Sequence, residues 1–230
     1  MHKIAILDVA AKPSPHFDAF EHCGLMVKRW LDAKLPEATL ICLDIKAGEP
    51  LPEIAEYAGF ILPGSEAGVY DDTPWMELLR LKLLEIREAG KPIYGICFGH
   101  QMMAHTYGGW AEKADKGFCL GERQFRASDG STITSHVSHQ DQVVELPSGA
   151  TVIAGSEYCP VAALEYDYPA LSTQFHPEYH PDFIRAIADF LEGDLMNAEQ
   201  AEAAKASLLP GRVSPDLFAD EVAAFFRRHL

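Results

Sequence analysis

The sequence has no clustered cysteines, no basic stripe and no long apolar run, and each absence excludes a class of protein. Its five cysteines are widely spaced and include no Cys-x-x-Cys pair. This spacing argues against a disulfide framework or a structural zinc site and favours a reducing compartment. Acidic residues outnumber basic ones by 34 to 19. A protein of this charge without a basic stripe is not expected to bind nucleic acid.

Membrane segments and nucleotide-binding loops are missing as well. No run approaches the roughly 20 apolar residues that cross a bilayer, and the apolar run at the N-terminus is too short for a signal peptide. There is neither a GxxxxGK[ST] loop nor the Ser-Gly-Gly loop of an ATP pyrophosphatase. We therefore expect a cytoplasmic protein with no membrane partner and no nucleotide site, whose 230 residues form one domain of ordinary size.

The first half of the chain alternates between strand and helix patterns. Short apolar runs predict strands at residues 3–9, 38–45, 59–62 and 92–96. Apolar residues at helical spacing predict helices at 17–35, at 75–89 and from His100 onward. Asp71 to Pro74 should cap the second helix, with Pro74 in its first position. This order indicates a doubly wound, mainly parallel α/β sheet with helices on both faces, whose site lies at the carboxyl ends of the strands.

From Gly108 onward the pattern changes to short β-like runs separated by turns. Runs at 117–126, 131–138, 142–146, 151–155 and 160–166 predict an antiparallel β subsheet, so that the whole sheet is mixed. A last strand at 170–175 precedes a helix at 182–191, and two C-terminal helices are expected, near 197–208 and from Pro215. We assign residues 1–192 to one domain and 193–230 to a helical extension packed on it. The apolar stripe of the last helix leaves a homodimer open as an alternative.

The most informative stretch runs from Pro92 to Gln101 and reads Pro-Ile-Tyr-Gly-Ile-Cys-Phe-Gly-His-Gln. An apolar strand ends in Cys97, which stands between Gly95 and Gly99, and a helix follows at once. Such a turn strains its central residue, and flanking glycines let the strand and the helix approach closely. The pattern predicts a nucleophile elbow in which the positive end of the helix stabilises negative charge on sulfur. Taken alone, it is equally typical of a buried cysteine in a tight turn.

A thiol nucleophile needs a histidine base and a third group that orients the base. Among ten histidines, His176 stands out because the predicted strand 170–175 delivers it to a strand end, where Pro177 stops the strand. Glu178 follows two residues later, so its carboxylate can reach back to the imidazole. Cys97, His176 and Glu178 are therefore predicted to form a catalytic triad at one edge of the sheet.

Other histidines and cysteines are weaker candidates for chemistry. His176 and His180 are spaced like metal ligands on a helix, but the prolines beside them prevent a shared helical turn. His136 and His139 lie three residues apart in a β-like run and should point to opposite faces. Cys119 lies between two glycines but is followed by a strand pattern, which favours a structural role. We expect no metal and no cofactor.

Four motifs follow one another in a characteristic order: Pro63-Gly-Ser65, Gly95-Ile-Cys-Phe-Gly-His-Gln101, Ser138-His-Gln-Asp-Gln-Val143 and Gln174-Phe-His-Pro-Glu178. Together they resemble the class I, triad-type glutamine amidotransferase family. They look most like the glutaminase domain of GMP synthase and its stand-alone relatives. The resemblance covers roughly residues 1–192 and implies the flavodoxin-like fold of that family.

The resemblance also implies a reaction. Cys97 would attack the γ-carboxamide of glutamine, or a γ-glutamyl peptide bond, to give a γ-glutamyl thioester. His176 would move the proton while Glu178 holds its imidazole, and water would then release glutamate. Backbone amides of Phe98 and of the Gly64-Ser65 turn would hold the oxyanion. Ser65 replaces the second glycine of the family pattern.

The resemblance further implies a binding site for the head group of glutamine. Gln101 and the segment 138–141 match the family positions that grip the amino and carboxylate ends of the substrate. A zwitterionic head group needs both donors and acceptors in its pocket. Gln140 replaces the glycine that is common in the family, which hints at a specialised substrate. The predicted binding residues are Gln101, Ser138, His139, Gln140 and Asp141.

Three functions fit these observations. The first is a stand-alone glutaminase that releases glutamate and ammonia, with a separate synthase as the ammonia acceptor. The second is a γ-glutamyl peptidase that acts on γ-glutamyl conjugates. The third is a non-catalytic binding or regulatory module, and the intact set of Cys97, His176 and Glu178 argues against it.

Overall fold

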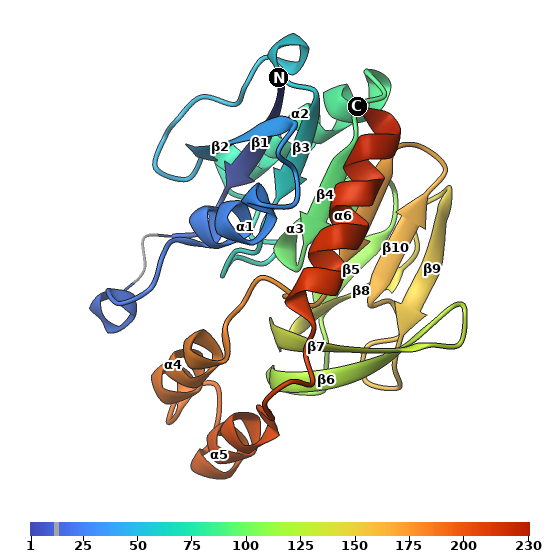
Figure 1. The fold of residues 1–230 in the computed structure, drawn as a ribbon. Coiled ribbons are helices and arrows are strands. Elements are labelled where there is room, and N and C mark those ends of the chain that lie inside the picture. The colour runs from blue at the N-terminus through green and yellow to red at the C-terminus, as the bar shows by residue number, and fades with distance from the viewer. Residues whose placement is uncertain (12–13) are drawn as a thin grey trace.

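The computed structural model describes residues 1–11 and 14–230, and its centre is a mixed sheet (Figure 1). The five strands of one half run parallel to one another, and the other half is antiparallel. In spatial order the strands are β2 (Ala38–Asp44), β1 (His2–Asp8), β3 (Gly59–Leu62), β4 (Ile93–Ile96), β11 (Ala170–Thr173), β10 (Ala163–Tyr166), β9 (Ala150–Gly155), β6 (Cys119–Ala127) and β7 (Thr132–His139).

Strand β1 shows why the strands of the parallel half are continuous apolar runs in the sequence. Its side chains alternate between two fully buried clusters. Ile4 and Ile6 face the helices α1 (Cys23–Asp32) and α6 (Pro215–His229), whereas Ala5 and Leu7 face α2 (Pro74–Glu88) and α3 (Phe98–Thr106). Helices therefore cover both faces, and the predicted doubly wound α/β sheet is confirmed.

The antiparallel half carries a second group of helices. Strands β6 and β7 form a hairpin, and β5 (Trp110–Lys113) pairs with β8 (Asp141–Glu145) in a separate two-stranded ribbon. Helices α4 (Pro181–Leu191) and α5 (Ala198–Ser207) pack with Leu120 of β6 in an apolar cluster. The sequence patterns predicted all of these strands except β5. In the described part of the chain, no helix is both long and apolar enough to cross a membrane.

The last helix, α6, lies along the face of the sheet that α1 also covers (Figure 1). Phe226 is fully buried in one cluster with Val27 of α1 and Tyr94 of β4. A Cβ at Gly59 would lie 2.9 Å from the Phe226 ring, so the glycine lets the helix approach β3. The Trp30 indole N–H donates to the carbonyl of Pro215 over 2.9 Å. These contacts attach the C-terminal helix to the sheet, and a domain boundary at residue 192 stays a prediction.

Two local predictions are wrong. The helix expected at 17–35 is shorter, Cys23–Asp32, and Phe17 instead ends a 3₁₀ turn, η1 (Pro15–Phe17). Phe17 and Phe20 matched the helical spacing because both are apolar, but their rings pack against Phe183 of α4, at 5.7 and 5.1 Å between centroids.

The cap of α2 also differs from the expectation. Pro74 is its first residue, as predicted, but the cap residue Thr73 makes no side-chain hydrogen bond. The Asp71 carboxylate instead accepts a hydrogen bond from the amide of Gly68, at 2.9 Å. Asp72 has a positive φ of 47°. The two aspartates therefore shape the loop before the helix rather than cap it.

Candidate active site

Cys97 occupies the turn between β4 and α3, with backbone angles of φ 51° and ψ −102°. Residues other than glycine rarely adopt a positive φ. The amide of Cys97 donates to the carbonyl of Thr173 in β11 over 2.8 Å, and its carbonyl accepts from the amide of Gln101 at 3.0 Å. The neighbouring strand and the first turn of the helix thus hold the strained residue from both sides.

The two glycines that flank Cys97 are required by close backbone contacts. A Cβ at Gly99 would lie 2.0 Å from the carbonyl oxygen of Leu62 in β3. A Cβ at Gly95 would lie 2.8 Å from the carbonyl carbon of Gly99. Backbone atoms cannot yield as a flexible side chain can, so any larger residue would push α3 away from the sheet. The turn therefore has the close strand-to-helix approach that the sequence predicts for an elbow.

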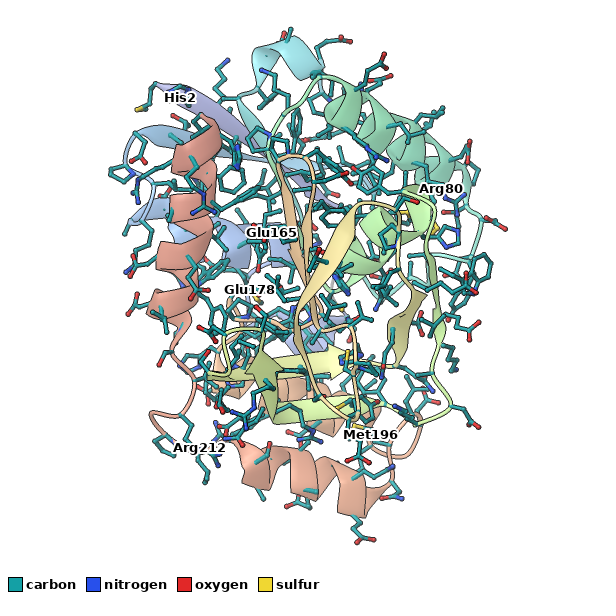
Figure 2. All side chains as sticks on the ribbon, turned by 90° about the vertical axis from the view of Figure 1, so that its right-hand side faces the viewer. His2, Arg80, Glu165, Glu178, Met196 and Arg212 are labelled. Atoms are coloured by element: carbon teal, nitrogen blue, oxygen red, sulfur yellow. The ribbon has the colours of Figure 1, made fainter. Side chains whose placement is uncertain are left out.

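His176 follows β11 and is fixed by both its backbone and its ring. Its amide donates to the carbonyl of His136 in β7 over 2.8 Å. Its Nδ1–H donates to Oε1 of Glu178 over 2.7 Å, and both side chains are 2% exposed. In Figure 2, Glu178 lies in the interior of the molecule, whereas Arg212 lies at its outline. The carboxylate fixes the tautomer of His176 and leaves Nε2 as the atom free to exchange a proton.

The environment of His176 keeps a proton on its ring. Burial alone would lower the pKa of His176, but the Glu178 carboxylate and the Cys97 side chain outweigh burial and raise that pKa above its ordinary value. The ring of Tyr179 stacks on the imidazole, with 3.9 Å between centroids and 7° between planes. The imidazole is therefore held on one edge by a carboxylate and on one face by Tyr179.

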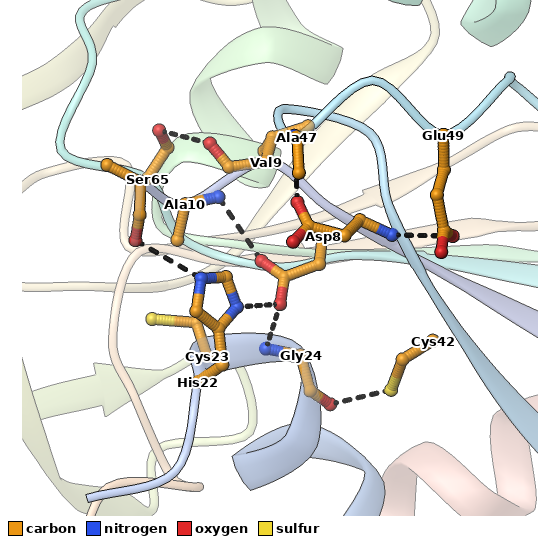
Figure 3. A network of polar contacts seen from close by, with 12 residues as sticks. Asp8, Val9, Ala10, His22, Cys23, Gly24, Cys42, Ala47, Glu49 and Ser65 are labelled. Carbon is orange, nitrogen blue, oxygen red and sulfur yellow. Dashed lines mark hydrogen bonds and ion pairs between the residues drawn. The ribbon is translucent and has the colours of Figure 1, made fainter. Parts of the chain in front are cut away.

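The loop after β3 brings its backbone against both Cys97 and His176. A Cβ at Gly64 would lie 2.9 Å from Cε1 of His176 and 3.7 Å from Cβ of Cys97. The hydroxyl of the next residue, Ser65, donates to the carbonyl of Val9 over 2.8 Å (Figure 3). A glycine could not make this bond, so the serine ties the loop to the end of β1.

A buried carboxylate holds the neighbouring end of β1, and the sequence patterns do not predict it. Asp8 is 3% exposed and accepts hydrogen bonds from the amides of Gly24, at 2.8 Å, and Ala10, at 3.2 Å. It also pairs with the ring of His22, just before α1 (Figure 3). Since Ser65 bonds to Val9 beside this cluster, the loop that carries Gly64 is anchored to the rigid start of α1.

The sulfur of Cys97 has two further polar neighbours. The side-chain amide of Gln174 donates to Sγ over 3.5 Å, and Sγ lies 3.7 Å from the carbonyl oxygen of Ser138. Gln101 donates from Nε2 to Oε1 of Gln174, at 3.0 Å. Neither Gln174 nor Tyr179 was among the predicted site residues. The signal for Gln174 was its place in the motif that ends at Glu178.

A cavity of about 530 Å³ opens at the sulfur. Its lining brings together nearly all of the predicted site residues, from strand ends and loops that are far apart in the sequence. These are Gly64, Ser65, Cys97, Gln101, Ser138, His139, Gln140, Asp141 and His176. Phe98 contributes differently, because its side chain is buried and packs on Trp75 at 5.8 Å between centroids. Its amide belongs to the first turn of α3, where no helical carbonyl accepts from it.

Several predicted head-group residues make internal hydrogen bonds in this structure. The side chain of Gln101 donates to the carbonyl of Asp141 over 2.9 Å, and Nδ1–H of His139 donates to the same carbonyl over 3.0 Å. Burial lowers the pKa of His139 to about 4, so this ring is neutral. The pKa of Asp141 is raised, because burial outweighs the Tyr70 hydroxyl and the Lys113 ammonium, which both lower it.

The histidines discounted as metal ligands have structural partners. Nδ1–H of His136 donates to the carbonyl of Tyr179 over 2.9 Å, and the ring of His180 accepts from the amide of Asp182 at the start of α4 over 3.3 Å. Within residues 1–11 and 14–230, no three histidine, cysteine or carboxylate side chains are grouped as a metal site would require.

The family model "Glutamine amidotransferase class-I" matches residues 22–186, a span that contains Cys97, His176 and Glu178. The chain belongs to the class I glutamine amidotransferase family. The resemblance that the four motifs indicated is thereby confirmed.

Curated relatives of this class I amidotransferase include two kinds of enzyme. Gamma-glutamyl peptidase 3 of Arabidopsis thaliana is 31% identical over 68% of this chain and 69% of the plant protein. The glutamine-hydrolysing GMP synthase of Thermus thermophilus is 32% identical over 74% of this chain. The match spans only 35% of that synthase. The similarity to GMP synthase therefore concerns about a third of the length of that enzyme.

Solved structures agree with the fold. A glutamine amidotransferase from Methylobacillus flagellatus superposes with a TM-score of 0.77 at 20% identity, over 100% of this chain and 95% of the other. A glutamine amidotransferase from Thermotoga maritima gives a TM-score of 0.74 at 22% identity, over 98% of both chains. These likenesses confirm the predicted flavodoxin-like fold.

Proposed function

We propose that this class I amidotransferase hydrolyses the γ-amide of glutamine through a thioester on Cys97, and that it acts as a stand-alone glutaminase. One arrangement carries this proposal: Cys97 and His176 line one cavity, and the buried Glu178 carboxylate bonds to Nδ1 of His176. A buried carboxylate that bonds Nδ1 of a histidine beside a thiol on a strained turn is the arrangement that cysteine hydrolases need.

The first half of the reaction forms the thioester. His176 holds at Nε2 the proton taken from the Cys97 thiol, because its pKa is raised, and the thiolate Sγ attacks the γ-carbonyl carbon of the substrate. The carbonyl oxygen of the tetrahedral intermediate is negatively charged and lies between the amides of Phe98 and of the Gly64-Ser65 loop. When the carbon–nitrogen bond breaks, the proton on His176 passes to the leaving amine. Because the pKa of His176 is raised, the ring holds this proton between the two steps.

The second half releases glutamate. Water gives a proton to Nε2 of His176 and attacks the thioester carbonyl, and the carbon–sulfur bond breaks with return of a proton to sulfur. Glu178 stays ionised and keeps the ring in place throughout. Gln101 and residues 138–141 line the part of the cavity where the head group of the substrate would bind. The ammonia could serve a separate synthase.

Replacing the nucleophile tests this proposal. Cys97→Ala should abolish the release of ammonia from glutamine and the cleavage of γ-glutamyl amides, because it removes the thiol that His176 activates. Cys42→Ala is the matched control, since this half-buried cysteine on β2 lies outside the cavity. A glutamine-like electrophile should add its mass to Cys97 alone. Activity retained by Cys97→Ala would refute the mechanism, and a protein that neither turns over substrate nor is labelled would be a binding module.

A second candidate function is cleavage of γ-glutamyl peptides. The similarity to gamma-glutamyl peptidases over two thirds of both chains favours it. Both functions use the same thioester and differ only in the amine that leaves. Ammonia release from glutamine and amino-acid release from γ-glutamyl dipeptides, measured side by side, distinguish them. No glutamine turnover together with rapid peptide cleavage would exclude the glutaminase.

A further inference from the structure

The cavity at Cys97 has two chemically different groups of lining residues. Cys97 and His176 line it together with polar groups that include Glu66, Lys113 and Asp141. Apolar side chains from η1, α4 and two loops form what we call its apolar half: Phe17, Phe118, Ile187, Phe190, Leu191 and Leu195. A cavity of about 530 Å³ is of the size that holds drug-like ligands, and glutamine alone is much smaller.

A chain of aromatic contacts connects the base to the apolar half. Tyr179 stacks on His176 and meets Phe183 edge to face, at 4.8 Å between centroids. Phe183 contacts Phe17 at 5.7 Å, and Phe17 contacts Phe190 at 5.1 Å. The apolar surface therefore begins beside His176, which would give its proton to the leaving nitrogen.

The apolar half is fixed in place by its own contacts. The ring of His16 in η1 donates from Nε2 to the carbonyl of Ala186 in α4 over 2.9 Å. Ile187 and Leu191 are 9% exposed at the base of this wall, while Phe190 and Leu195 are each 48% exposed at its rim. Apolar side chains gathered at the rim of a polar site indicate a binding surface for an apolar group.

We propose that the apolar half binds the amine side of a γ-glutamyl amide, so that the preferred substrates are γ-glutamyl conjugates of large apolar or aromatic amines. This rests on the second candidate function above, the cleavage of γ-glutamyl peptides through Cys97. A substrate whose nitrogen lies against His176 must direct any substituent on that nitrogen past Tyr179. The substituent then reaches Phe17, Phe118 and Phe190. Ammonia, the leaving group of glutamine, would leave this wall empty.

The test compares leaving groups that share one γ-glutamyl part. The substrates are γ-glutamyl-phenylalanine, γ-glutamyl-glycine and glutamine. Turnover of each is measured as the release of glutamate. We expect kcat/KM to be roughly 10- to 200-fold higher for γ-glutamyl-phenylalanine than for γ-glutamyl-glycine, the range in which an apolar pocket discriminates. Phe190→Ala should lower kcat/KM about tenfold for the phenylalanine conjugate, the scale of one lost aromatic contact. The same variant should change kcat/KM for the glycine conjugate less than about twofold.

Leu217→Ala is the control, because this leucine is equally apolar and 59% exposed but lies on α6 outside the cavity. Equal kcat/KM for the two dipeptides, or a Phe190→Ala variant that behaves as the control does, would overturn the proposed wall and leave the cleavage reaction intact. Binding to Cys97→Ala, measured by calorimetry, separates the two proposals. Tighter binding of the phenylalanine conjugate by at least tenfold, with no turnover by the native protein, would overturn the reaction and support the wall.

Discussion

Lowering the pH from 7 to 5 should lower the free energy of unfolding by about 2 kcal/mol through His100 alone. His100 is fully buried in α3. Its Nδ1 accepts from the hydroxyl of Ser172 at 2.8 Å, and its Nε2–H donates to the carbonyl of Val161 at 3.1 Å. Both ring nitrogens are thus used by the neutral form, and burial lowers the pKa of His100 to about 3.

The sign follows from the protons bound in each state. In the unfolded chain His100 takes up a proton below pH ~6.5, while in the folded protein it stays neutral down to about pH 3. The unfolded state therefore binds more protons in this window, and stability falls as the pH falls. Each pH unit is worth about 1.4 kcal/mol, so the 1.5 or so units between 6.5 and 5 give about 2 kcal/mol.

Urea denaturation at pH 7 and pH 5 measures this difference. His100→Gln removes the titrating ring, so its loss of unfolding free energy between the two pH values should be about 2 kcal/mol smaller than that of the native protein. His229→Gln, at an exposed position in the last turn of α6, should behave as the native protein does. If His100→Gln lost as much as the native protein, and the NMR signal of the His100 ring titrated near pH ~6.5, the reasoning would be wrong.

Two further predictions concern the proposed catalytic groups. Glu178→Gln should lower kcat by roughly 10²- to 10⁴-fold with little change in KM, because the imidazole loses its charged partner. Steady-state kinetics against an exposed control, Glu165→Gln on β10, measures this, and an unchanged kcat would remove Glu178 from the mechanism. Gly64→Ala should lower kcat at least tenfold, since the new Cβ would lie 2.9 Å from Cε1 of His176. Full activity of this variant would contradict the placement of the loop against the base.

The parallel half of the sheet and the elbow were predictable because local sequence determines both. A run such as Ile4 to Leu7 is typical of a strand buried on both faces, and each of its side chains does enter an apolar cluster. Gly95 and Gly99 flank Cys97 because backbone atoms approach within contact distance on both sides. His176 and Glu178 are two residues apart, so their hydrogen bond is nearly local.

The features that the sequence did not reveal depend on tertiary contacts. Phe17 has helical spacing but packs on α4. Tyr179 reads as an ordinary residue after Glu178 until its ring is seen stacked on His176. Gln174 contacts the sulfur only because β11 lies beside β4. None of these contacts leaves a period or a spacing of its own in the sequence, and only Gln174 had a signal, its place in the motif that ends at Glu178.

One backbone carbonyl sets the direction of the hydrogen bonds that reach the sulfur. The carbonyl of Asp141 can only accept, so Gln101 must turn its NH₂ group toward it. The second N–H of Gln101 then occupies the oxygen of Gln174, whose own NH₂ group must face Cys97. Flipping Gln101 would leave its oxygen opposite the carbonyl of Asp141, and flipping Gln174 would leave the two NH₂ groups opposite each other. Sγ of Cys97 therefore meets a donor whether it is a thiolate or part of a thioester, and Asp141, the first residue of β8, fixes that polarity.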